Sequence, residues 1–80
     1  MSLEAFIEEK LNQYAQKIID GKAASDELAL GELNFYAALR RVASGKATTA
    51  DLGLFDAIND TLQQLGVLAE GETLTKKIKP

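Results

Sequence analysis

The sequence predicts an all-α protein, a small three-helix bundle built from two helical hairpins and followed by a loosely structured C-terminal tail. Apolar residues recur at steps of three and four over three long stretches of the chain. Glycines and helix-capping residues separate these stretches. We therefore expect residues 1–68 to form a helical domain and residues 69–80 to form the tail.

The first helix is expected from about Ser2 to Asp20. Acidic residues near its start and Lys17 near its end suit the helix macrodipole. Gly21 follows, and glycine readily takes the left-handed conformation that closes many helices. The apolar residues with helical spacing are Leu3, Phe6, Ile7, Leu11, Tyr14, Ile18 and Ile19.

The second helix is expected from Ser25 to Gly45, with Ser25 as its N-cap and Gly45 as its stop. Its apolar residues occupy nearly all sides, so neighbouring helices must cover it from more than one direction. Gly31 lowers helix stability by about 1 kcal/mol relative to alanine, and it marks either a close helix contact or a break before Glu32. The apolar residues form two adjacent stripes: Leu28, Phe35, Leu39 and Val42, and beside them Leu30, Leu33, Tyr36 and Ala37.

The third helix is expected to begin after Thr48 and to end at Gly66. Thr48 followed by Asp51 resembles a capping box, in which each residue satisfies a backbone N–H group of the other. Val67 and Leu68 come directly after the glycine and are expected to fold back onto the last turn. The apolar stripe of this helix consists of Leu52, Phe55, Ile58, Leu62 and Leu65.

Composition excludes most enzyme classes. The chain has 80 residues and contains no cysteine, histidine or tryptophan, so it lacks a thiolate, an imidazole base and the usual zinc ligands. No apolar run approaches the roughly 20 residues that cross a bilayer, and the first residues lack the basic-then-apolar order expected of a signal peptide. We expect a soluble, cytoplasmic, non-enzymatic protein without a cofactor, a metal, a small-molecule substrate or a membrane partner.

Size also bears on assembly. A chain of 80 residues lies near the lower limit at which a single core suffices without a disulfide, a metal or a partner. We therefore expect a homo-oligomer.

Two acidic residues stand one helical turn apart on the third helix, Asp56 and Asp60. Paired carboxylates could hold Mg²⁺ or act as acid and base. Nothing apolar or basic beside them defines a pocket, so the pair is interpreted as part of a solvated face. Ser25 and Thr48 could be imagined as nucleophiles, but no neighbouring base would activate either hydroxyl.

Three aromatic residues, Tyr14, Phe35 and Tyr36, allow two interpretations. They could form an exposed patch for a partner, or they could pack in the core. Core packing is expected for at least two of them.

Basic residues gather at the end of the second helix, in the connector after it, and in the tail. They could contact DNA phosphates, or the arginines could complement the C-terminal end of the helix dipole. The third helix carries several aspartates and no cation, so it does not suit the major groove. The candidate binding residues are Arg40, Arg41, Lys46, Lys76, Lys77 and Lys79.

The segment Leu39 to Leu68 resembles the compact helical region of small terminase subunits from short-tailed phages of the T7 type. The core of the match is SGKATTADL, from Ser44 to Leu52, preceded by a helix that ends in arginines. The resemblance implies a non-enzymatic DNA-packaging factor that oligomerises, recognises phage DNA and presents it to the large ATPase and nuclease subunit. By position, Arg40, Arg41 and Lys46 would be brought to DNA.

The leading functional hypothesis is a phage- or prophage-type assembly protein that works as a terminase small subunit. Its partners would be further copies of itself, a large packaging subunit and double-stranded DNA. The alternative is a protein-interaction or structural module without a DNA role. A net charge of -3 and an excess of apolar residues favour the alternative.

Overall fold

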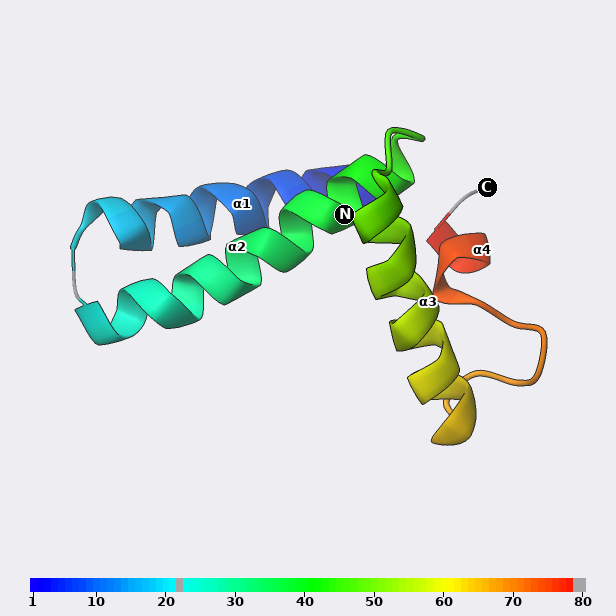
Figure 1. The fold of residues 1–80 in the computed structure, drawn as a ribbon. Helices are drawn as coiled ribbons and strands as arrows, with labels where there is room; N and C mark the ends of the chain where they lie inside the picture. Colours follow the sequence, from blue (N-terminus) through cyan, green and yellow to red (C-terminus); the bar gives the residue numbers. More distant parts are fainter. Residues whose placement is uncertain (22, 79–80) are drawn as a thin grey trace. The chain divides into compact units, whose positions relative to one another are not determined.

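The secondary structure is helical (Figure 1), in a computed structural model that describes residues 1–21 and 23–78. Its helices are α1 (Leu3–Ile19), α2 (Ala23–Ala43), α3 (Thr49–Gln64) and the short α4 (Leu74–Ile78). The described residues contain no strand. The all-α prediction is therefore confirmed, and α4 is a single short helix inside the segment predicted as a tail.

The chain divides into two compact units, Met1–Arg40 and Arg41–Pro80. The first unit contains α1 and most of α2. The second contains the last residues of α2, then α3, α4 and their connections.

Helix α1 and helix α2 form an antiparallel hairpin in the first unit (Figure 1). Ser2 is the N-cap of α1, and its hydroxyl accepts a hydrogen bond from the Ala5 backbone N–H at 3.1 Å. Glu8, near the start of α1, pairs with Arg40, near the end of α2, at 2.9 Å. Both side chains are at least half exposed, so this ion pair contributes little to stability.

Aromatic rings join the two helices of the hairpin. The Tyr36 ring of α2 stacks on Tyr14 of α1 and meets Phe6 and Phe35 edge-on, with centroid distances of 6.0, 5.8 and 5.3 Å. Tyr14 is buried, whereas Phe35 and Tyr36 are half-buried. Stacked and edge-on pairs are the arrangements that aromatic rings prefer, so these contacts support the core-packing interpretation.

Three expectations for α2 are corrected. The helix begins at Ala23, so Ser25 lies within its first turn and does not precede it as an N-cap. Ala23 and Ala24 precede Ser25, and because alanine is the best helix former, the helix begins two residues earlier than expected. The helix also runs through Gly31 without a break, and a Cβ atom there would meet nothing within 4 Å, so neither interpretation of this glycine holds. Leu28, expected in a covered stripe, is 68% exposed, while Leu39 and Val42 of that stripe are buried.

Both ends of α3 follow the chemistry expected from the sequence. Thr48 is its N-cap and forms a complete capping box with Asp51. At the other end Gly66 has a φ of 77°, and the Val67 N–H donates to the Leu62 carbonyl at 2.9 Å, which closes the helix. Leu68 is buried, as expected, but Val67 is 68% exposed.

The core of the second unit combines apolar and polar side chains. Phe55 is 2% exposed and is the largest fully buried side chain of the described residues. Asp51 and Asn59, on the same helix, are each 5% exposed. Buried polar groups need hydrogen-bond partners, and those of Asp51 and Asn59 define the sites described next.

Candidate nucleic-acid interface

The corner between α2 and α3 carries the residues for which DNA contact was predicted. Gly45 has a φ of 75°, a left-handed conformation that costs a residue with a Cβ atom about 1–2 kcal/mol. With this conformation, the Gly45 N–H donates to Val42 O at 3.3 Å and the Lys46 N–H to Arg41 O at 2.8 Å. These bonds end α2 and turn the chain toward the N-cap of α3.

A bidentate ion pair between Arg41 and Asp51 closes this corner. Arg41 Nε donates to Asp51 Oδ2 at 2.6 Å, and Arg41 Nη2 donates to Asp51 Oδ1 at 2.8 Å. Asp51 Oδ2 also accepts from the Thr48 backbone N–H at 3.0 Å, as the second half of the capping box. One carboxylate therefore joins the last turn of α2 to the first turn of α3.

The electrostatics of the pair agree with its geometry. Hydrogen bonds from Arg41, and then from the Thr48 backbone, hold the pKa of Asp51 well below its usual range. The same contact with Asp51 raises the pKa of Arg41. The Asp51 side chain is only 6% exposed, so it remains ionised in a nearly buried position because three donors surround it.

This ion pair changes the role expected of Arg41. The sequence suggested either phosphate contact or interaction with the helix dipole, and neither interpretation included a carboxylate ten residues further on. Two N–H groups of the guanidinium are bound by Asp51, so Arg41 fixes the corner, while 43% of its side chain stays exposed. Arg40 pairs with Glu8 in the first unit, and Lys46 is exposed in the connector.

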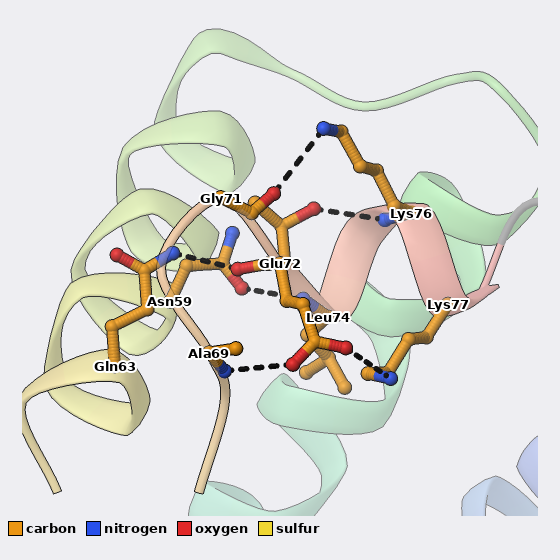
Figure 2. Close-up of polar contacts among 9 residues, drawn as sticks. Asn59, Gln63, Ala69, Gly71, Glu72, Leu74, Lys76 and Lys77 are labelled. Atoms are coloured by element: carbon orange, nitrogen blue, oxygen red, sulfur yellow. Dashed lines mark hydrogen bonds and ion pairs between the residues drawn. The ribbon is translucent and has the colours of Figure 1, made fainter. Parts of the chain in front are cut away.

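The segment after α3 holds two more of the candidate cations, in α4 (Figure 2). Asn59 Oδ1 accepts from the Leu74 backbone N–H at 2.8 Å, which satisfies the first backbone donor of α4. Gln63 Nε2 donates to the Glu72 carbonyl at 2.6 Å. Two amide side chains on α3 thus fix the position of the segment that carries Lys76 and Lys77.

Both lysines of α4 have partners within their own segment. Lys77 Nζ lies 3.1 Å from Glu72 Oε2, and Lys76 Nζ donates to the Gly71 carbonyl at 3.3 Å. The bond from the Ala69 backbone N–H, and then that from Lys77, lower the pKa of Glu72. Lys76 and Lys77 are exposed, and Lys79 lies outside the described residues.

The predicted acidic face is solvated. Asp56 and Asp60 are both exposed. A shallow polar hollow of about 270 Å³ adjoins Asp60 and is lined also by Gln63, Gln64 and Glu70. Within residues 1–21 and 23–78, no three ligand-type side chains come together as a metal site requires.

A second hollow, on α3, is apolar. It has a volume of about 230 Å³ and is lined by Leu54, Ala57, Ile58, Thr61 and Leu62. Leu54 is 44% exposed, and Leu65, one turn beyond the hollow, is 70% exposed. We call the side chains of the hollow, together with Leu65, the α3 apolar face.

Some of these features were not predicted from the sequence. The sequence pattern assigns no role to Asn59, yet its side chain is buried. Its partner is the Leu74 backbone, fifteen residues further along the chain, where no periodic pattern connects the two. The sequence pattern assigns no role to Glu72 either. A glycine directly before it, in a segment without periodicity, was the available sign of a tight turn.

Comparisons of the chain with protein-family models, with curated proteins and with solved structures find no match. No helix among the described residues is both long enough and apolar enough to cross a bilayer.

Proposed function

We propose that the protein is a non-enzymatic helical assembly protein of phage or prophage type, which aids DNA packaging as a terminase small subunit. The observation that carries the proposal is the corner from Arg41 to Asp51. Its sequence lies within the segment that resembles the T7-type subunits, and its helix stop, capping box and ion pair give this part of the segment a defined conformation. This conformation leaves Lys46 exposed.

Double-stranded DNA is the proposed ligand, bound through phosphate contacts. Lys46, Lys76 and Lys77 are exposed cations of the second unit, and phosphate oxygens are their natural partners. Arg41 contributes indirectly, because its pair with Asp51 fixes the corner. Few cations per chain give weak binding, so several copies acting together would supply the affinity.

Assembly of copies is the second part of the proposal. The α3 apolar face and the small size of the chain support a homo-oligomer. In the proposed role the oligomer would hand DNA to a large packaging subunit.

The test is DNA binding over a series of salt concentrations. Lys46→Ala should weaken binding to duplex DNA and reduce the slope of log K against log salt concentration by about 1. Lys17→Ala is the matched control. It removes the same charge from the first unit, where the ammonium lies 5.3 Å from the centroid of the Tyr14 ring. No binding at low salt, together with a monomeric mass in solution, would refute the proposal.

The second candidate function is a protein-interaction or structural module that binds no DNA. It is favoured by the pairing of Arg40, Arg41 and Lys77 with carboxylates, which reduces the positive charge offered to phosphate. Leu54→Asp places a charge on the α3 apolar face. Loss of an identified protein partner in this variant, with no DNA binding by the wild type, would favour the second function.

A further inference from the structure

A tight turn fixes the position of Glu72. The Glu72 N–H donates to the Ala69 carbonyl at 3.0 Å, and Gly71, the third residue of the turn, has a φ of 83°. A positive φ at this position is what a type II turn requires, and glycine adopts it without steric cost. The Glu72 side chain closes the turn from the other side, since its Oε1 atom accepts from the Ala69 N–H at 2.7 Å.

The second oxygen of the same carboxylate faces Lys77 of α4 (Figure 2). Glu72 Oε2 lies 3.1 Å from Lys77 Nζ, while Lys76 Nζ is held by the Gly71 carbonyl in the same turn. Thr73 supports this geometry, because its hydroxyl accepts from the Lys76 backbone N–H at 3.0 Å and so caps the short helix. The turn therefore presents one carboxylate and one carbonyl oxygen to two ammonium groups.

We propose that Glu72 is an intramolecular competitor for DNA phosphate, which occupies Lys77 in the unbound protein and must give it up when DNA binds. The inference rests on the proposed function and adds regulation to it. A carboxylate oxygen and a phosphate oxygen are alternative acceptors for the same ammonium group. While Asn59 and Gln63 hold this segment on α3, Glu72 therefore inhibits phosphate binding by Lys77.

DNA phosphate can displace Glu72 from Lys77. Lys77 and Glu72 are 54% and 45% exposed, and ion pairs of this kind contribute little because water and salt screen them. DNA carries many phosphates and releases bound counterions when a lysine replaces them. The competitor has one advantage: the turn holds it next to Lys77 at every DNA concentration. It therefore lowers affinity without abolishing binding.

The docking contacts on α3 maintain the inhibited form. A helix as short as α4 is not stable alone in water. Its first backbone N–H depends on Asn59, and the Glu72 carbonyl depends on Gln63. By thermodynamic reciprocity, DNA bound at Lys77 weakens the contact with Glu72 as much as that contact weakens DNA binding.

The experiment measures the affinity of a short duplex DNA for the full chain by fluorescence anisotropy at low salt. Glu72→Gln removes the charge but keeps an oxygen that can accept from the Ala69 N–H. Glu70→Gln is the matched control, because it removes the same charge two residues away, from a side chain lining the polar hollow. We expect Glu72→Gln to tighten binding about two- to fivefold more than Glu70→Gln does. In a Lys77→Ala background this difference should vanish.

Each outcome decides the proposal. If the wild type binds DNA and both glutamine variants shift the affinity equally, Glu72 is no competitor, although the proposed function stands. A difference that persists in the Lys77→Ala background also overturns it. If only Glu72→Gln binds DNA, the contact abolishes binding instead of lowering its affinity, and the inferred competition is overturned. If no variant binds even at low salt, the inference falls, and the proposed function falls with it when the protein is also monomeric in solution.

A measurement on the wild type guards against a variant that fails to fold. The carboxyl carbon of Glu72 is followed by NMR while pH is varied, with and without duplex DNA, and Glu70 serves as the internal control. If Lys77 leaves Glu72 and binds DNA phosphate, the pKa of Glu72 should rise more than that of Glu70. Equal shifts of the two groups would mean that Lys77 stays with Glu72, and would overturn the proposal.

Discussion

The two compact units of this chain differ in the kind of side chain that holds their helices together. In Met1–Arg40, the helices meet through aromatic rings, with Tyr36 touching three others. In Arg41–Pro80, oriented polar side chains join separate elements: Asp51 closes the corner and Asn59 holds α4. Charge differs as well, since the first unit has seven acidic and four basic residues and the second has five of each.

This difference determines how each unit tolerates change. Ring packing is adaptable, because several geometries of similar energy exist for an aromatic pair. A buried hydrogen bond is less forgiving, because loss of one partner leaves the other unsatisfied. We therefore expect substitutions to act gradually in the first unit and sharply in the second, and the following predictions test this contrast.

The largest difference is expected for one substitution made in both units. Phe55→Ala removes a ring that is 2% exposed and should lower the free energy of unfolding by roughly 3–5 kcal/mol. Phe6→Ala removes a ring that is 37% exposed, so it should cost less than half as much. Urea unfolding of both variants measures the two costs. Equal costs would show that the half-exposed ring cluster is as essential as the buried core.

A smaller effect is expected at the amide that docks α4. Asn59→Ala leaves the Leu74 N–H without its acceptor and should cost about 1–3 kcal/mol. Hydrogen exchange at the Leu74 amide should become faster. Asp60→Ala, at the exposed neighbouring position, should change stability by no more than about 0.5 kcal/mol. Unchanged exchange at Leu74 in the first variant would contradict the docking role of Asn59.

Glycine to alanine should have opposite signs at two positions. Gly45→Ala forces a Cβ atom into a left-handed conformation and should cost about 1–2 kcal/mol. Gly31→Ala lies inside α2 with open space around it and should stabilise the protein by up to about 1 kcal/mol. Thermal unfolding of the two variants gives the signs directly. A stabilising effect at Gly45 would mean that the corner can end α2 in another conformation.

The smallest effects on the free energy of unfolding are expected from changes of pH near neutrality. In the second unit stability should fall toward acid pH, and in the first unit it should fall toward alkaline pH. The folded-state pKa of Asp51 is held below its usual range, so its stabilisation is present above its unfolded-state pKa of about 4. That contribution is lost as pH falls toward the folded-state value. In the first unit, a hydrogen bond to Glu32, and then burial, raise the pKa of Tyr14 to about 12. Its contribution is complete below about pH 10 and is lost as pH rises through about 12.

Two variants separate these titrations. Asp51→Asn should remove part of the acid sensitivity and leave the alkaline response unchanged. Tyr14→Phe should remove part of the alkaline response, because phenylalanine keeps the ring and lacks the ionisable hydroxyl. Urea unfolding across the pH range measures both. If Tyr14→Phe left the alkaline limb unchanged, the assignment of the alkaline response to Tyr14 would be wrong.

The same contrast explains how far the sequence alone could go. Apolar spacing predicted α1, α2 and α3, and the local chemistry of Thr48 with Asp51 predicted the start of α3, because such signals lie within a few residues of one another. The pairing of Arg41 with Asp51 was missed because ten residues and a change of direction separate them. Leu28 was misjudged for a related reason: periodicity identifies an apolar stripe but not whether a neighbour covers it.

The candidate site was predicted less well than the fold. Sequence position marked Arg40, Arg41, Lys46, Lys76 and Lys77 as cations but could not show which of them already have partners. Four of these five make a polar side-chain contact in the described structure, through carboxylates at Glu8, Asp51 and Glu72 and the carbonyl of Gly71. Such pairing depends on tertiary geometry, which charge patterning along the chain does not encode.

The closed corner also has a consequence for the order of folding. Its bonds join Arg41, Thr48 and Asp51, which are at most ten residues apart, so forming them requires closure of only a short loop. Loops of this length close in about 10–100 ns. The bond between Asn59 and Leu74 spans fifteen residues and needs α3 to exist first. We therefore expect the corner to be structured in the folding transition state and α4 to dock after the barrier has been crossed.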